Sequence, residues 1–237
     1  MPFDLTGLLL PEQHCDLWQV NLDNLADSSG FLASLLNEPE KARLSRFTNP
    51  NAALAFLGSR GFLRLLGSKY LNIPSTEIRI GIAEHGKPFF EDFPNLHFNV
   101  SHSRNCLVLL FAPCQCGVDV ECTSRKIDYT PIMTRFFGET EILSWKKQAD
   151  PANAFFRGWT RKEAYLKATG EGISGLRKVQ VSFSPSLPKP VISIEDQTTQ
   201  CSDWNFCEFF IEPDFVGAIA LLGPELVCHF RSLKNFT

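Results

Sequence analysis

The pattern of apolar and polar positions divides the chain into helical and extended segments. After Asn49 and Pro50, which are typical of a helix cap and first turn, apolar residues recur at helical spacing up to about residue 71. Residues 17–22 instead alternate as in a half-buried strand. The same criteria predict helices at residues 38–47, 49–71, 132–137, 139–148 and 152–169, and strands at 17–22, 78–82, 96–100, 106–111, 117–120, 178–183, 191–194, 204–211 and 216–222. Gly170 is expected to end the last helix, and residues 106–111 and 117–120 are expected to form a hairpin. Both halves of the chain thus combine helices with a small antiparallel sheet, which predicts an α+β fold.

Composition and charge narrow the class of protein. With 237 residues, 44% of them hydrophobic and 21% charged, the chain can bury a core in one large or two small domains. A formal net charge of −3 and the absence of a basic run argue against nucleic-acid binding. The longest apolar stretches, residues 106–112 and 215–222, are too short to span a bilayer, and the first four residues lack the basic start of a secretory signal. A cytoplasmic protein without membrane association is expected.

The eight cysteines are expected to be reduced thiols, mostly buried. They lie mainly in apolar segments, and no CxxC pair occurs. Cys114, Cys116 and Cys122 are close enough in sequence to suggest zinc, but they lack a fourth ligand at metal spacing.

Two short stretches carry residues for metal and phosphate chemistry. In residues 117–121, Asp119 and Glu121 alternate with valines, so on a strand the two acids project from one face. In residues 159–167, Trp159, Glu163 and Lys167 are spaced i, i+4, i+8 and form one ridge of a helix. By itself, the pair of Glu163 and Lys167 could equally be an ordinary surface salt bridge.

Asp119, Glu121 and Glu163 are the candidate metal ligands. Three carboxylates facing one point repel one another by roughly 3 kcal/mol per pair at about 5 Å and an effective dielectric near 20, which a cation between them relieves. Oxygen ligands without Cys or His favour Mg²⁺, whose coordination is usually completed by substrate phosphates and water. A diphosphate is therefore the expected substrate.

These stretches and their flanks resemble the 4'-phosphopantetheinyl transferases of the surfactin-synthetase type. The resemblance rests on Gly86-Lys87-Pro88, on residues 98–103 (FNVSHS), and on the two acidic motifs, in the family's order. Residues 135–141 (RFFGETE) resemble the family's linker helix, and residues 170–173 (GEGI) resemble the loop after its catalytic helix. The similarity spans residues 43–173.

The resemblance implies a fold of two similar α/β-sandwich-like halves related by a pseudo-two-fold, with the active site at their interface. The boundary is expected near residues 112–118, giving an N-terminal half of residues 1–114 that contacts the nucleotide and phosphates of coenzyme A. Residues 115–237 then form the C-terminal half, with the metal-binding acids and the catalytic helix. Since this chain has about twice the length of the short trimeric synthases of the superfamily, a monomer with both halves is expected.

The implied reaction transfers the 4'-phosphopantetheine arm of coenzyme A to a serine of an apo acyl or peptidyl carrier protein, and releases adenosine 3',5'-bisphosphate. Mg²⁺, with Mn²⁺ as a possible substitute, is expected on Asp119, Glu121 and Glu163. Glu163, Lys167 and Asp119 are the expected catalytic residues: Glu163 takes the serine proton directly or through water, and Lys167 offsets charge on the departing phosphate. The carrier could belong to fatty-acid, polyketide or nonribosomal-peptide biosynthesis.

The resemblance also implies which residues bind coenzyme A. They are Arg43, Arg60, Arg64, Lys87, Pro88, Ser101, His102, Lys162 and Lys167. Guanidinium groups suit the 3'-phosphate, although the three arginines could also be solvated helix charges. Trp159 is expected to pack its helix, and Lys162 is a candidate second cation.

Two local patterns suggest other chemistry and are rejected. Residues 81–87 fit the G-x-x-x-x-G-K spacing of a P-loop, but Pro88 stands where a Ser or Thr hydroxyl must meet Mg²⁺. Ser101 and His102 are neighbours on an extended chain, so their side chains point to opposite sides and cannot form a nucleophile and base pair.

Two other functions remain open: hydrolysis of a coenzyme A or nucleotide pyrophosphate, and non-catalytic coenzyme A binding. The carrier protein is expected to dock on exposed apolar residues next to positive charge, for which Arg135, Phe136 and Phe137 are candidates, unless they pack in the core.

Overall fold

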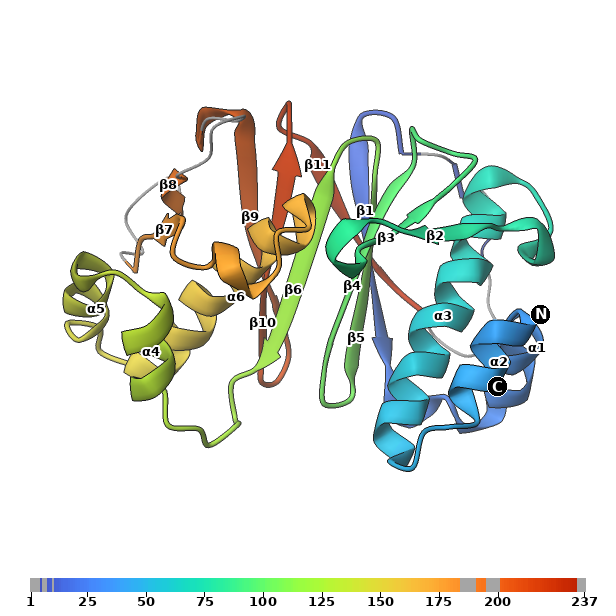
Figure 1. Ribbon diagram of the computed structural model, residues 1–237, viewed down its shortest axis with the longest axis horizontal. Helices are drawn as coiled ribbons and strands as arrows, with labels where there is room; N and C mark the ends of the chain where they lie inside the picture. Colours follow the sequence, from blue (N-terminus) through green and yellow to red (C-terminus); the bar gives the residue numbers. More distant parts are fainter. Residues whose placement is uncertain (1–4, 6–7, 10, 184–190, 195–200, 234–237) are drawn as a thin grey trace. The chain divides into compact units, whose positions relative to one another are not determined.

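The computed structural model describes residues 5, 8–9, 11–183, 191–194 and 201–233 (Figure 1). The chain forms two compact units. The first comprises Met1–Gly81, Pro88–Pro113 and Val227–Thr237, and the second comprises Ile82–Lys87 and Cys114–Leu226. The predicted halves, 1–114 and 115–237, differ from these units because the turn 82–87 groups with the second unit and the last segment returns to the first.

The first unit is built on a sheet in the order β11-β1-β5-β4. Its strands are β1 (His14–Asn21), β4 (His97–Ser103), β5 (Cys106–Ala112) and β11 (Val227–Ser232). β5 pairs antiparallel with both β1 and β4, whereas β11 pairs parallel with β1. A short two-stranded sheet joins β2 (Ile80–Ile82) to β3 (Pro88–Phe90).

Helix α3 (Pro50–Leu71) supplies the helical side of the first core. It begins as predicted, because the Asn49 side chain accepts hydrogen bonds from the first-turn amides and Pro50 opens the helix. Its buried residues Phe62, Leu66 and Tyr70 belong to one apolar cluster with β1 and β5. Helices α1 (Ser29–Ser34) and α2 (Glu38–Leu44) precede it.

The second unit contains a sheet in the order β6-β10-β9 and the helices α4, α5 and α6 (Figure 1). The strands are β6 (Cys116–Cys122), β9 (Trp204–Ile211) and β10 (Phe215–Leu222), all paired antiparallel. The helices are α4 (Thr130–Phe136), α5 (Glu139–Trp145) and α6 (Pro151–Thr169), and α6 packs on β6 and β10. β7 (Val179–Val181) and β8 (Val191–Ile194) pair with each other.

The predicted hairpin between residues 106–111 and 117–120 is wrong. β5 lies between β1 and β4, so both of its edges are already hydrogen-bonded, and its side chains are buried on both faces. β6 instead pairs with β10 in a different sheet. Residues 112–116 therefore lead from one unit to the other and do not form a hairpin turn.

The prediction of an α+β fold is confirmed by the mixture of helices with antiparallel strand pairs. Gly170 ends α6 as predicted, in the left-handed conformation at φ 82° that glycine adopts without steric cost. β11 and β3 were not predicted. No helix among the described residues is long and apolar enough to cross a bilayer.

Candidate active site

β6 carries two of the three predicted metal ligands. Val118 and Val120 are fully buried, Asp119 is 5% exposed, and Glu121 is half-buried. A Cβ added at Gly117, two residues before Asp119 on the strand, would lie 2.1 Å from the Ala164 carbonyl oxygen of α6. Because alternate residues of a strand share a face, this contact shows that the acids lie on the face that α6 covers.

Helix α6 is capped at its start and bound to the sheet along its length. The Asp150 side chain accepts a hydrogen bond from the Asn153 amide, and Pro151 occupies the first turn. On β9, Glu208 forms ion pairs with Arg157 at 3.0 Å and with Arg161 at 2.8 Å. These contacts tie two successive turns of α6 to the sheet, and so hold Glu163 and Lys167 over β6.

The predicted ridge of α6 meets the acids of β6. Lys167 Nζ lies 2.6 Å from Asp119 Oδ1, which joins the two motifs predicted to act together. Glu121 is held from its other side by Arg125, whose guanidinium donates a hydrogen bond at 2.9 Å. Cations thus already offset part of the negative charge of this acidic group.

Glu163 is electrostatically coupled to both acids. Burial is the main cause that raises the pKa of its carboxyl to about 7, and repulsion from Asp119 and Glu121 acts in the same direction against the attraction of Lys167. A carboxyl with this pKa is partly protonated at neutral pH and can accept a proton near the working pH of most enzymes.

The three acids fit Mg²⁺ by donor type and by shared location. Hard carboxylate oxygens are the donors this ion prefers, and the mutual repulsion that contributes to the raised pKa of Glu163 is the kind that a cation relieves. In the described part of the chain, however, the donor atoms of Asp119, Glu121 and Glu163 do not all lie within 4.8 Å of one another. Rotation of the two glutamate side chains would have to gather them around an ion.

Lys87 lies in the same unit as these residues. Its ammonium group donates to the Ala168 carbonyl oxygen at the end of α6 and, at 3.3 Å, to the carbonyl oxygen of Cys116. Burial lowers the pKa of Lys87. Its charge therefore lies at the C-terminal end of α6, where the helix dipole favours a cation.

The structure does not support the prediction that Lys162 binds coenzyme A. Its side chain is fully buried, and its ammonium group is bonded to Glu141 at 3.0 Å and to the carbonyl oxygens of Phe136, Leu176 and Val179. It also lies 4.5 Å from the centre of the Phe137 ring. Adjacent residues point about 100° apart around a helix, so Lys162 faces the core while Glu163 faces β6.

Of the three predicted arginines, Arg64 is also structural. It is 2% exposed, pairs with Glu40 at 2.7 Å, and donates to the carbonyl oxygens of Ser75 and Ile78. Since this side chain is almost fully buried and already paired, the structure does not support the prediction that it binds a phosphate.

Arg43 and Arg60 remain accessible in the first unit. Arg43 is exposed and lies 5.1 Å from the centre of the Phe56 ring. Arg60 is half-buried, and its pKa is lowered mainly by burial, with the charges of Arg43 and Arg64 acting in the same direction and Glu40 opposing them. An anion that bound beside these arginines would relieve the repulsion between their charges.

β4 places Ser101 and His102 on opposite sides, as predicted. Ser101 is 5% exposed, whereas His102 is exposed. The expected separation of nucleophile and base is thus confirmed, and His102 is available to a ligand in solvent. Pro88 is half-buried at the start of β3.

The predicted docking residues separate into buried and accessible ones. Phe137 is 2% exposed in the second core, so its prediction as a surface residue is wrong. Arg135 is exposed, with its guanidinium 5.1 Å from the centre of the half-buried Phe136 ring. Trp159 packs against Phe136 and Phe155, as expected for a residue that holds its helix.

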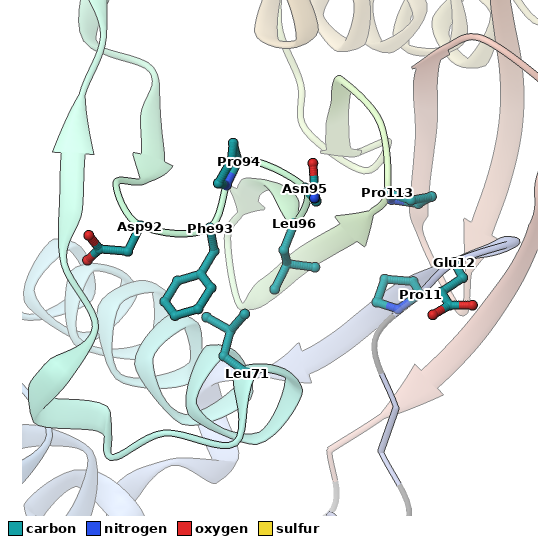
Figure 2. A pocket seen from close by; sticks show the side chains of 9 residues that line it. All are labelled: Pro11, Glu12, Leu71, Asp92, Phe93, Pro94, Asn95, Leu96 and Pro113. Carbon is teal, nitrogen blue, oxygen red and sulfur yellow. The ribbon is translucent and has the colours of Figure 1, made fainter.

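A surface pocket of about 530 Å³ in the first unit does not involve the predicted site (Figure 2). Pro11, Pro94, Pro113, Leu71, Phe93 and Leu96 supply its apolar lining, and Glu12, Asp92 and Asn95 supply its polar groups. Its charged groups are acidic, and Asp92 is already paired with Arg79. The pocket is unsuited to a phosphate-bearing ligand.

The residues that hold α6 in position were not predicted from the sequence. Glu141 lies in the motif assigned to the linker helix, but its role as the buried partner of Lys162 was not predicted. Glu208 was not predicted either, although Arg157 and Arg161 at i, i+4 spacing could have indicated a shared acidic partner.

Comparison with known proteins identifies the family. Residues 115–220 match the family model described as the 4'-phosphopantetheinyl transferase superfamily, and residues 24–114 match that of the 4'-phosphopantetheinyl transferase N-terminal region. The 4'-phosphopantetheinyl transferase HetI of Nostoc sp. is 34% identical over 228 residues, which cover 94% of this chain and 92% of that protein. The chain belongs to the 4'-phosphopantetheinyl transferase superfamily.

Two further relatives among the 4'-phosphopantetheinyl transferases match with lower identity over shorter segments. The human L-aminoadipate-semialdehyde dehydrogenase-phosphopantetheinyl transferase is 30% identical over 207 residues, covering 78% of this chain and 67% of that protein. The 4'-phosphopantetheinyl transferase Sfp of Bacillus subtilis is 30% identical over 143 residues, covering 60% of this chain and 63% of its own. The resemblance inferred from the sequence motifs is thereby confirmed.

Proposed function

We propose that this chain is a magnesium-dependent 4'-phosphopantetheinyl transferase that modifies a serine of an acyl or peptidyl carrier protein. Coenzyme A is the proposed donor, and adenosine 3',5'-bisphosphate is the second product. The observation that carries the proposal is the joining of the two family motifs by the 2.6 Å ion pair between Lys167 and Asp119, with Glu163 electrostatically coupled to the same acids.

Asp119, Glu121 and Glu163 are proposed to hold Mg²⁺, with Mn²⁺ as a possible substitute. When bound, the ion supplies a positive charge that stabilises pyrophosphate oxygens during substitution at phosphorus. To bind it, the acids must exchange at least part of their present pairing with Lys167 and Arg125. Lys167 is then available to offset charge on the departing bisphosphate.

Glu163 is the proposed base for the carrier serine. The serine hydroxyl must lose its proton as the new oxygen–phosphorus bond forms, and Glu163 would accept this proton directly or through a bound water. The remaining task of the protein is to position donor and acceptor in line.

Arg43, Arg60 and His102 are the proposed contacts for the phosphates of coenzyme A in the first unit, together with Ser101 and Pro88 of the family motifs. Lys87 is proposed to act from the second unit. Arg64 and Lys162 are not included, because their side chains are almost fully buried as well as paired with Glu40 and Glu141. The pseudo-two-fold relation of the halves, the active site at their interface, the monomeric state and the cytoplasmic location stay predictions from the sequence.

Arg135 and Phe136 are proposed as part of the docking surface for the carrier. They combine an exposed cation with a partly exposed ring, which suits an acidic helical protein. The pathway of that carrier stays open among fatty-acid, polyketide and nonribosomal-peptide biosynthesis.

The test is incubation of the protein with coenzyme A, Mg²⁺ and a panel of apo-carriers, followed by intact-mass measurement of each carrier. A phosphopantetheine-sized mass gain on one carrier, lost in the Glu163→Gln variant and on chelation of the metal, is the expected result. Consumption of coenzyme A without any carrier would instead identify a pyrophosphate hydrolase. Full transfer by the Glu163→Gln variant would contradict the assigned roles of the acids, and coenzyme A binding without transfer to any carrier would favour a scaffold.

A further inference from the structure

A second group of possible metal ligands lies in the first unit, on the paired strands β1 and β11. His14 and Asp16 are two residues apart on β1 and so share one face of the sheet. β11 pairs parallel with β1 (Figure 1). The register of this pair places His229 directly beside Asp16. The fold thus brings one carboxylate and two imidazoles to the same place from segments more than 200 residues apart in the sequence.

The donor atoms of these three residues are close to the spacing of a metal site. His14 Nε2 lies 3.7 Å from Asp16 Oδ1, and His229 Nδ1 lies 3.5 Å from the same oxygen. All three donor atoms lie within 4.8 Å of one another, and among the described residues no other group of His, Cys, Asp and Glu meets this criterion. Metal–ligand bonds of about 2.1 Å in tetrahedral geometry separate donors by about 3.4 Å, so small side-chain rotations suffice.

The two imidazoles are already arranged side by side. Their ring centres are 4.4 Å apart with an angle of 29° between the planes, and both rings direct a nitrogen to the same carboxylate. If both were protonated, the stacked rings would repel each other. Neutral imidazoles sharing a metal ion avoid that repulsion.

The carboxylate of Asp16 is fixed by partners outside the group of three. Asp16 is fully buried, accepts a hydrogen bond from the Tyr70 hydroxyl on Oδ2, and accepts one from Arg231 Nε at 2.7 Å on Oδ1. Trp18 Nε1 in turn donates to Tyr70 at 2.8 Å. Metal-ligating carboxylates commonly have such outer partners, and Oδ1 keeps a second lone pair for a metal while Arg231 remains bound.

We propose that His14, Asp16 and His229 form a binding site for Zn²⁺ or a similar divalent transition metal ion. Two imidazole nitrogens select such an ion over Mg²⁺, which prefers oxygen donors, so this site differs in chemistry from the acidic group on β6 and α6. The inference does not depend on the proposed transferase function. Its expected role is to hold β11 on β1.

Solvent completes the coordination and gives the ion access. The side chains of His14 and His229 are 23% and 46% exposed, so water can occupy the remaining positions. A surface cavity of about 720 Å³, lined by His14, Tyr70 and Glu12 among others, adjoins His14 and offers an entry path. Because Arg231 balances the charge of Asp16, binding is expected to be weaker than at closed sites with several thiolates.

The experiment is equilibrium dialysis of the full chain against Zn²⁺ with Mg²⁺ in excess, with metal content measured by mass spectrometry. An Asp119→Asn background removes one ligand of the acidic site and prevents binding there from being counted. His14→Gln and His229→Gln are the test variants. His85→Asn removes an exposed histidine outside the group, and Cys228→Ser changes a thiol one residue from His229 on the same strand, next to Cys15 in the register. This second control matters because thiolates also bind zinc.

The expected result is about one Zn²⁺ per chain in the background protein and in both controls, with at least a tenfold loss of affinity in each histidine variant. Zn²⁺ should also raise the Tm of the background protein and not that of the histidine variants. Stoichiometric binding that survives both histidine substitutions, or that is lost in Cys228→Ser, would overturn the proposal, as would no binding at all.

Co²⁺ provides a test that needs no histidine variant to fold. Bound to the background protein, it should give visible absorption bands of a site with nitrogen and oxygen ligands. A thiolate charge-transfer band would place the metal on cysteine, and the absence of any protein-induced band would show that Asp16 is satisfied by Arg231 and Tyr70 alone. Either result contradicts the proposal.

Discussion

At the scale of single residues, two lysines of helix α6 have different roles. Lys162 is fully buried against Glu141, whereas the Lys167 side chain is 30% exposed and pairs with Asp119. Both lysines belong to the same family motif, and the sequence alone assigned both to the ligand. They project from different faces of α6, and the packing of the helix decides which face is turned to the core.

These two lysines are expected to respond differently to substitution. Lys162→Met leaves the carboxylate of Glu141 buried without its cation, and the loss of one partner of a buried pair should lower the free energy of unfolding by about 3–5 kcal/mol. Lys167→Met should cost less, roughly 1–2 kcal/mol, because Asp119 is buried but the Lys167 side chain is 30% exposed, so water can partly replace its charge. It should nevertheless reduce turnover about a hundredfold through lost charge stabilisation. Urea denaturation and carrier-modification rates measure the two effects, and equal stability losses in both variants would contradict this distinction.

The raised pKa of Glu163 predicts how stability changes with pH in the metal-free protein. Because its folded-state pKa, about 7, lies above the ordinary value of 4.5, the folded state binds the proton more tightly. The resulting stabilisation is complete below about pH 4.5 and is lost as the pH rises through 7. The Glu163→Gln substitution removes this dependence on pH. At pH 8 the free energy of unfolding of the variant should be roughly 1–3 kcal/mol higher than that of the wild type, whereas at pH 5 the two should be similar.

The measurement is urea denaturation of both proteins at the two pH values, with a chelator present to keep them metal-free. Glu225→Gln, which changes an exposed glutamate in a loop, is the control and should leave the pH dependence unchanged. If Glu163→Gln and the wild type showed the same difference in stability between pH 5 and pH 8, the carboxyl would not have the raised pKa that burial and its acidic neighbours give it.

At the scale of secondary-structure elements, the active-site geometry depends on the close approach of α6 to β6. A Cβ at position 117 would lie 2.1 Å from the Ala164 carbonyl oxygen and 2.4 Å from the Ala168 nitrogen. Both atoms belong to the helix backbone, so no side-chain rotation can relieve the clash. Glycine is therefore required for Glu163 and Lys167 to reach the acids of β6.

Gly117→Ala should push α6 away from β6 and cost at least about 2–3 kcal/mol of stability, as expected for overpacking against a rigid backbone. Turnover should fall more than tenfold even at temperatures where the variant is folded, because small displacements of catalytic groups are costly. Gly30→Ala is the matched control, since nothing lies within 4 Å of the added Cβ and alanine favours the helix. Thermal unfolding measures the loss of stability, and kinetic assays measure the loss of turnover. Unchanged turnover in Gly117→Ala would show that α6 can shift without affecting catalysis.

Sequence patterns predicted the elements well where local residues decide them. Asn49 with Pro50 determined the start of α3, and Gly170 the end of α6, because caps depend on neighbours within a few positions. The false hairpin after β5 and the missed strand β11 have a non-local cause. Whether a strand edge is free depends on partners far along the chain, and β11 carries too many exposed residues to show a clear alternation.

Prediction of the candidate site had the same limit. The acids and Lys167 were identified because strand and helix periodicity place them on definite faces, and Lys167 does meet Asp119. The structural pairing of Arg64 and Lys162 was missed because a basic residue in a helix does not by itself indicate whether the fold places an acid beside it. Their partners, Glu40 and Glu141, lie 24 and 21 residues away in the sequence.

At the scale of the whole molecule, the path of the chain links the two units. It begins in the first unit, passes to the second after Pro113, and returns to the first to form β11. β11 covers the edge of β1 and supplies Arg231 to the fully buried Asp16. The first unit is therefore incomplete until the last part of the sequence has been synthesised.

A chain that ends at Leu226 should consequently lose stability in the first unit. It exposes the hydrogen-bonding edge of β1 and removes Arg231 from the buried carboxylate of Asp16, which by itself should cost about 3–5 kcal/mol. A chain that ends at Leu233 keeps β11 and is the control. Hydrogen exchange should show amides of β1 and β5 exchanging much faster in the shorter chain, with β6 and α6 less affected. Equal protection of β1 in both truncated chains would show that the first unit forms without its last strand, and that Tyr70 alone is sufficient to hold the charge of Asp16.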